Sequence, residues 1–142
     1  MKIIIEKPPI YEAILAHRMT PSEKTIFTYG DTIYNPNNVP ISDDLMVHEE
    51  VHSKQQNHSD DYAEIWWGRY LVDPCFRIAQ EVEAYANQYD FICKKVKDRN
   101  RRSRILLDIA GVLSGPVYGN MIGRSDAYQM IKNQNQKQKQ NE

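Results

Sequence analysis

The 142-residue sequence predicts a single α+β domain, and two observations support this prediction. Short runs of β-branched and aromatic residues lie within residues 2–34, where strands are expected. Apolar residues at helical spacing dominate the chain from residue 43 onward. No internal repeat marks a second domain. We therefore expect one domain over residues 1–131, followed by a disordered polar tail over residues 132–142.

The first part of the chain is expected to form a small sheet and a short helix. Residues 2–5 predict a strand, and residues 9–17 predict a helix that begins with a proline. The runs KTIFTYG (24–30) and TIYNPNN (32–38) are joined at Gly30-Asp31, which is typical of a hairpin or an edge strand.

Two predicted helices follow the sheet. Ser42 is the expected N-cap of a helix that continues through HEEVH (48–52), and the two aspartates after the cap suit its first turn. Residues 60–72, which include the cluster IWWGRYL, predict a second, aromatic-rich helix that stops before Asp73-Pro74.

The clearest periodicity lies in residues 75–96, where apolar residues repeat at intervals of four and three and form one face of a long helix. These residues are Ile78, Val82, Tyr85, Tyr89, Ile92 and Val96. The basic run 94–104 is expected to end this helix. The remaining predicted elements are a helix, a turn-rich loop and a short last helix capped by Ser125, over residues 105–112, 115–123 and 125–131.

HEEVH fits the HExxH zinc signature. Residues four apart on a helix share one face, so His48 and His52 can direct both imidazoles to one ion. Glu49 lies beside them, where it can act as the general base on a zinc-bound water. This arrangement is typical of a metallopeptidase and predicts one Zn²⁺ per chain. The alternative is an amphipathic helix with two incidental histidines, and a third ligand decides between the two interpretations.

His58 is one candidate for the third ligand. HEEVHSKQQNHSDD (48–61) matches the metzincin string HExxHxxGxxHxxD except at the glycine, which is Gln55 here. That glycine lets the helix stop and the chain return to the metal. Because Gln55 favours a continued helix, His58 would lie about 15 Å along the axis from His48. We therefore do not expect His58 to bind the ion.

Glu81, within QEVEAYA (80–86), is the other candidate. At about 100° per residue, Glu81 flanks the apolar stripe of its helix, whereas Glu83 points away from it. A carboxylate at the edge of a core needs a partner. With HExxH present, we predict that Glu81 completes a His₂Glu site with His48 and His52.

The segment EVEAY resembles the E-x-x-A-D or E-x-x-A-N pattern of gluzincins, zinc metallopeptidases whose third ligand is a glutamate on a later helix. On this resemblance the glutamate is Glu81 and the alanine is Ala84. Tyr85 stands where these families place the Asp or Asn that orients a histidine ligand. Tyr85 either replaces that hydrogen bond or belongs to the core.

The chain is also similar, over about residues 20–131, to small zincin-like proteins of tailed bacteriophages and prophages. The similar segments are HEEVH, FRIAQEVEAYANQY and YGNMIG. The resemblance implies a minimal gluzincin fold with a small N-terminal sheet, an HExxH active-site helix and a C-terminal glutamate helix. In such folds a peptide substrate commonly adds to an edge strand beside the metal, and residues 25–29 are the expected strand. Related zincins stabilise an oxyanion with a tyrosine or histidine, and Tyr118 is a candidate for that residue.

Three functions compete. The first is a zinc-dependent peptidase that hydrolyses a peptide or protein substrate. The second is a zinc-binding, catalytically weak phage protein that serves as an interaction or structural module. The third is an adaptor that binds an acidic partner through the basic run 94–104, with HEEVH incidental. No nucleic-acid motif accompanies this run, so nucleic-acid binding there is expected to be nonspecific at most.

Composition and cysteine usage predict a cytoplasmic protein with no membrane partner. No apolar stretch is long enough to span a bilayer, and residues 1–10 lack the apolar run of a signal peptide. Cys75 and Cys93 would lie about 27 Å apart on one helix, too far for a disulfide. The expected location is the host cytoplasm if the chain is phage-encoded, and association with a virion stays open.

Overall fold

The computed structural model describes residues 1–141 and is mostly helical, with a small sheet near the N-terminus. This confirms the expected α+β class. The helices that follow the sheet are α2 (Asp43–Gln55), α3 (Tyr62–Val72), α4 (Pro74–Lys95), α5 (Arg99–Leu113), the 3₁₀-helix η1 (Pro116–Tyr118) and α6 (Arg124–Gln140). Among these described residues, no helix is both long enough and apolar enough to cross a membrane.

The sheet has three strands in the order β1-β3-β2. β1 (Lys2–Ile4) pairs in parallel with β3 (Thr32–Tyr34), and β2 (Phe27–Tyr29) pairs antiparallel with β3. The predicted hairpin is confirmed, and its turn places Gly30 at a φ of 65°, a conformation that favours glycine. Between β1 and β2 lies α1 (Tyr11–Ala16), which is shorter than the predicted helix over residues 9–17.

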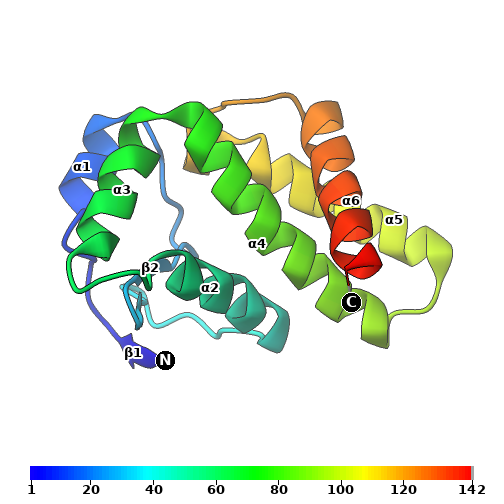
Figure 1. Cartoon of the computed structure of the whole chain (residues 1–142), viewed down its shortest axis with the longest axis horizontal. Helices are drawn as coiled ribbons and strands as arrows, with labels where there is room; N and C mark the ends of the chain where they lie inside the picture. Colours follow the sequence, from blue (N-terminus) through cyan, green and yellow to red (C-terminus); the bar gives the residue numbers. More distant parts are fainter. Residues whose placement is uncertain (142) are drawn as a thin grey trace.

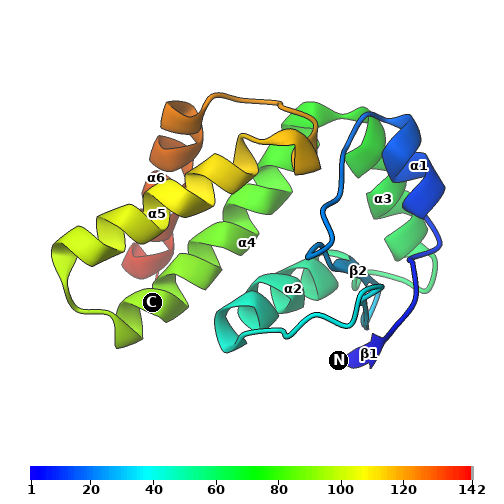
Figure 2. The ribbon, with the colours of Figure 1, turned by 180° about the vertical axis from the view of Figure 1, so that it is seen from behind.

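The long helix α4 runs through the middle of the molecule, as Figures 1 and 2 show. On one side it packs against α2 and α3, with α1 and the sheet beyond them, and on the other side it packs against α5 and α6. Each side has its own apolar cluster. The first is formed by aromatic and aliphatic side chains of α1, β2 and α3, including Ile14, Phe27, Trp66, Trp67 and Tyr70. The second joins α4, α5 and α6 and includes Val82, Leu106, Leu113, Ala127 and Ile131.

The basic run 94–104 is predicted only to end the long helix α4. In the structure it is divided between two helices. α4 ends at Lys95 and α5 begins at Arg99, so residues 99–104 are helical. Arg102 explains part of this arrangement, because its guanidinium donates to the carbonyls of Val96 and Cys93, each at 2.5 Å. It therefore satisfies carbonyl groups left open at the end of α4.

Two predictions about the last helix are wrong. α6 begins at Arg124 with Gly123 at its N-cap, so Ser125 lies within the helix rather than capping it. The helix also continues through Gln140, where a disordered tail was expected from residue 132. Glutamine and lysine are good helix formers, and Asn135 is buried against α4, where it donates to the Ala86 carbonyl at 3.4 Å. Glu142 lies outside the described residues.

Arg77, in the first turn of α4, joins this helix to α3 and the η1 loop. It is only 4% exposed, and its nitrogens donate to the carbonyls of Tyr70 and Leu71 at 2.8 Å and of Tyr118 at 3.0 Å. The first two carbonyls lie in the last turn of α3, which has no helical donors for them. Arg77 therefore fixes the end of α3 and the η1 loop relative to α4.

We expect the substitution Arg77→Met to lower the free energy of unfolding by about 3 kcal/mol, because three carbonyls would lose their donor. Arg69→Met is the matched control, since Arg69 is exposed and, within residues 1–141, its side chain forms only a 3.6 Å ion pair with Asp73 and a stacking contact with Phe76. It should cost about 1 kcal/mol or less. Urea denaturation measures both, and equal losses would contradict the role of Arg77.

Candidate metal centre

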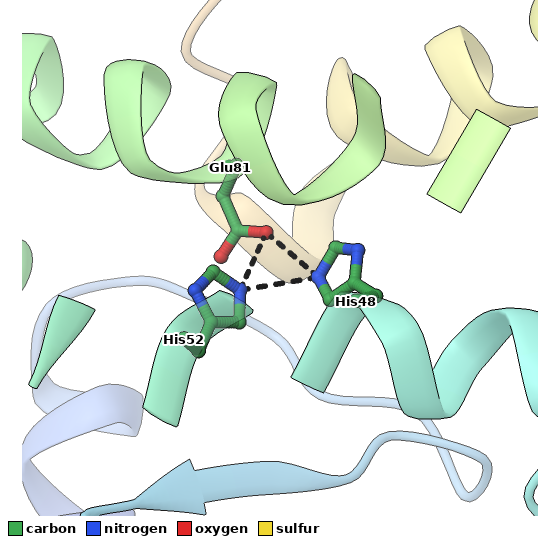
Figure 3. A group of neighbouring side chains, drawn as sticks. All are labelled: His48, His52 and Glu81. Atoms are coloured by element: carbon green, nitrogen blue, oxygen red, sulfur yellow. Dashed lines mark hydrogen bonds and ion pairs between the residues drawn. The ribbon is translucent and has the colours of Figure 1, made fainter. Parts of the chain in front are cut away.

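Three buried side chains from two helices converge on one point, as Figure 3 shows. His48 and His52 project from successive turns of α2, and Glu81 projects from α4 above them. The two Nε2 atoms lie 3.1 Å apart, and each lies 3.2 Å from Glu81 Oε1. The structure thus brings together the three residues that the sequence predicts as ligands.

The spacing of these atoms fits a tetrahedral metal ion. Ligand bonds of about 2.0–2.1 Å at tetrahedral angles place ligand atoms about 3.3 Å from one another. The observed separations of 3.1–3.2 Å are close to this value. The group could therefore hold one ion through two imidazole nitrogens and one carboxylate oxygen.

The packing of α2 along α4 produces this convergence. His48 and His52 are one helical turn apart and both face α4, where they are buried. Glu81 lies at the edge of the apolar stripe of α4 and is 3% exposed. Glu83 is exposed, as the helical periodicity predicts, and accepts a hydrogen bond from Gln55 Nε2 at 3.2 Å.

Charge pairing holds the three groups together when no metal is bound. Burial lowers the pKa of His52, but the neighbouring Glu81 carboxylate outweighs this effect and raises the pKa to about 9. Burial alone would raise the pKa of Glu81, yet His52 and His48 keep it well below its usual range. Near neutral pH, His52 is therefore a cation beside an anionic Glu81, and an entering metal ion must displace the His52 proton.

Two hydrogen bonds that the sequence analysis missed orient the predicted ligands. Gln55 Oε1 accepts from His52 Nδ1 at 2.8 Å, which leaves Nε2 directed at the site. Tyr70 donates its hydroxyl to Glu81 Oε2 at 2.7 Å, and burial raises the pKa of Tyr70, so the donor keeps its proton. Gln55 lies three residues after His52, and this helical spacing indicates that the two side chains can meet. No pattern in the sequence around Tyr70 indicates a contact with Glu81.

Tyr85 does not replace the hydrogen bond that the family pattern supplies to a histidine. Its hydroxyl is 2.6 Å from the Tyr118 hydroxyl, and its ring packs against the His48 ring with centroids 4.3 Å apart. Within residues 1–141, His48 Nδ1 has no hydrogen-bond partner. Tyr85 therefore positions His48 by packing, because its hydroxyl extends past the histidine toward the η1 loop.

His58 lies outside the cluster, as expected, but for a different reason. α2 ends at Gln55 instead of continuing through His58. His58 is exposed in the following turn, and its ring packs against Tyr62 at 4.4 Å between centroids. The chain does not return to the metal position, because Gln55 and Gln56 hold the end of α2 against α4 and β2 through hydrogen bonds.

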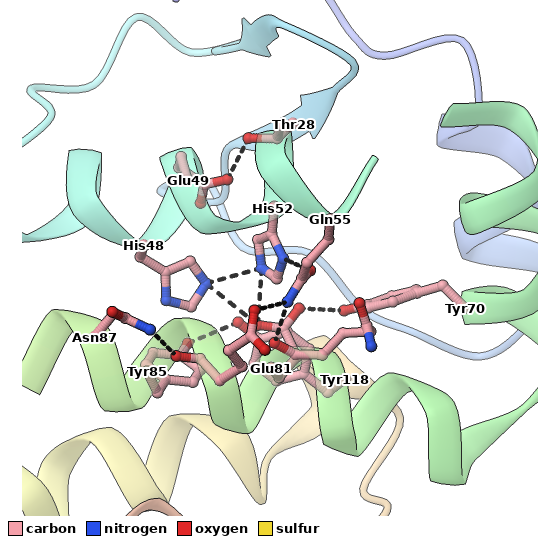
Figure 4. Close-up of polar contacts among 12 residues, drawn as sticks. Thr28, His48, Glu49, His52, Gln55, Tyr70, Glu81, Tyr85, Asn87 and Tyr118 are labelled. Carbon is pink, nitrogen blue, oxygen red and sulfur yellow. Dashed lines mark hydrogen bonds and ion pairs between the residues drawn. The ribbon is translucent and has the colours of Figure 1, made fainter. Parts of the chain in front are cut away.

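A cavity of about 60 Å³ lies beside the three ligands. Glu49 also lines it, is buried, and accepts a hydrogen bond of 2.5 Å from the Thr28 hydroxyl (Figure 4). Apolar residues form much of the remaining wall, including Ile14, Met19, Phe27, Trp66 and Val117. Tyr118 lines the same cavity.

The predicted edge strand lies where expected, but one of its carbonyl groups already accepts hydrogen bonds from side chains of the protein. β2 is at the edge of the sheet, and residues 25–28 line the cavity. The Thr28 carbonyl accepts hydrogen bonds from Trp67 Nε1 and Gln56 Nε2, both at 3.0 Å. A peptide that pairs with β2 would therefore compete with these two side chains at Thr28.

Comparisons with known proteins give no family for this chain, so the assignment of the metal ligands rests on the geometry of the site. No family model matches the chain, and neither curated proteins nor solved structures give a significant match. The resemblance to gluzincins and to phage zincin-like proteins thus stays a prediction from the sequence.

We expect Glu81→Ala to weaken zinc binding by more than the roughly 10–100-fold typical of losing an orienting partner, because a ligand is removed. Glu83→Ala and His58→Ala should leave the affinity nearly intact, since neither residue belongs to the cluster. Competition with a chelating dye measures all three variants. Zinc retained in Glu81→Ala and lost in His58→Ala would reverse the assignment of the third ligand.

Zinc binding at pH 7.5 should release about one proton, because the pKa of His52 is raised to about 9 in the metal-free protein. The proton competes with the metal below this pKa, so the apparent affinity should rise by about tenfold per pH unit and level off near pH 9. Calorimetry in two buffers of different ionisation enthalpy counts the protons released. Binding without proton release would show that His52 is already neutral.

Proposed function

We propose that the protein is a zinc-dependent metallopeptidase of the gluzincin type. In this proposal His48, His52 and Glu81 hold the ion and Glu49 is the general base. The observation that carries the proposal is that one cavity contains a complete three-ligand group and a buried carboxylate that is not part of it. Catalytic zinc sites commonly combine three protein ligands with one open position, and a His₂Glu set is one of the recurring ligand groups.

Zinc, when bound, would supply Lewis-acid chemistry, lowering the pKa of a water molecule and polarising a peptide carbonyl. The protein would supply the proton transfers. Glu49 would accept a proton from the attacking water and deliver it to the leaving amine. Tyr118 is the candidate donor to the developing oxyanion, because it lines the same cavity and burial raises the pKa of its hydroxyl, which therefore keeps its proton.

A second function, zinc binding without efficient catalysis, is favoured by the size of the cavity. Its volume of about 60 Å³ is well below the roughly 150 Å³ of an engineered protein cavity that holds benzene. A peptide would need more room than this conformation offers. In that case the protein would be a zinc-stabilised interaction module, and a peptide-library cleavage assay of the zinc-loaded protein separates the two functions.

The peptidase proposal predicts that Glu49→Gln keeps zinc but loses about 10²-fold or more in cleavage rate, because the variant cannot accept the proton. Glu50→Gln is the matched control, since Glu50 is adjacent on α2 but exposed, and it should retain the wild-type rate. Zinc content is measured by elemental analysis and the rate with a cleavable peptide. A Glu49→Gln variant that cuts as fast as wild type would exclude this mechanism.

A further inference from the structure

Glu49 is held by a residue from a different part of the fold. Thr28 lies on the edge strand β2 and Glu49 on α2, 21 residues further along the chain, and the two side chains are 2.5 Å apart between Oγ1 and Oε2 (Figure 4). Thr28 is 2% exposed and Glu49 is 5% exposed. A buried carboxylate requires a donor, and a short hydrogen bond to an ionised carboxylate is among the stronger ones in proteins.

The position of the Thr28 hydroxyl is itself fixed. Two side chains donate to the Thr28 carbonyl, Trp67 Nε1 from α3 and Gln56 Nε2 from the end of α2, both at 3.0 Å. Gln56 also accepts from the Gly30 amide at 2.8 Å, which fixes the hairpin turn. Since the branched side chain of threonine has few χ1 rotamers, an anchored backbone leaves its hydroxyl little freedom.

We propose that Thr28 is a positioning residue that sets which oxygen of Glu49 acts as the base. This inference rests on the proposed function of Glu49. The Thr28 hydroxyl donates its hydrogen bond to Oε2 of Glu49, so Oε1 is left to receive the proton from water. The same bond restrains the carboxylate beside β2, so that Glu49 does not become a fourth ligand of an ion held by its neighbour His48.

Thr28→Val and Thr28→Ser separate the hydroxyl from the shape of the side chain. Valine keeps the branched shape without the donor, and serine keeps the donor. We expect Thr28→Val to lower kcat by roughly 10–100-fold, the range seen when an orienting partner is lost, while KM changes less than about twofold and zinc affinity is retained. Thr28→Ser should restore most of the rate. Thr32→Val, on the neighbouring strand β3, is the control and should leave every value unchanged.

A binding measurement tests the same inference without turnover. Acetohydroxamate chelates zinc and can donate a proton to a carboxylate beside the metal. Its affinity for the zinc-loaded protein should fall by about tenfold in Thr28→Val and in Glu49→Gln, and should fall no further in the double variant. Non-additivity is expected because both substitutions interrupt one interaction. Additive losses would indicate a general structural role for Thr28 and would overturn the proposal.

The two readouts distinguish the possible failures. If the zinc-loaded wild type cleaves no peptide, the proposed peptidase function fails, but acetohydroxamate binding still decides the role of Thr28. Equal affinity in wild type and Thr28→Val would overturn the positioning role whatever the activity. If Thr28→Val does not fold, as judged by its melting temperature, Thr28→Ala removes the same hydroxyl without adding a methyl group in its place.

Discussion

The packing of α2 against α4 is the constraint on which the candidate site depends. Neither helix alone carries three ligands, and only their contact brings Glu81 to 3.2 Å from both histidines. Burying a carboxylate and two imidazoles is unfavourable unless they pair, so the cluster and the helix contact support each other. The second apolar cluster packs α4 against α5 and α6, and Phe76 of α4 packs against the first cluster.

The parts of the site that follow from local periodicity could be predicted from the sequence. The four-residue interval between His48 and His52 and the choice of Glu81 over Glu83 both depend on helix geometry within one segment. The hairpin at Gly30 also has a local signature. Partners that come from distant segments, such as Thr28 for Glu49 and Tyr70 for Glu81, leave no such pattern. They follow only from how the elements pack.

Tertiary contacts also explain why two predictions from local sequence are wrong. The glutamine-rich C-terminal segment lacks the apolar residues that signal a packed helix, but one buried side chain, Asn135, reaches a backbone carbonyl of α4. Gln55 was expected to prolong α2, yet it ends the helix and supports His52. In both cases a polar side chain forms a hydrogen bond with one specific partner. A hydrophobicity pattern does not predict such a bond.

The two hydrogen bonds of Gln56 have a mechanical consequence. This side chain links the end of α2 to both Thr28 and the turn at Gly30, so direct hydrogen bonds hold the histidine helix and the edge strand together. Two other segments that line the cavity, the one that precedes β2 and the η1 loop, are joined by a hydrogen bond from the Thr20 amide to the Pro116 carbonyl at 2.9 Å. Since Arg77 also ties the η1 loop to α4, the shape of the cavity depends on hydrogen bonds that link all of these segments to one another.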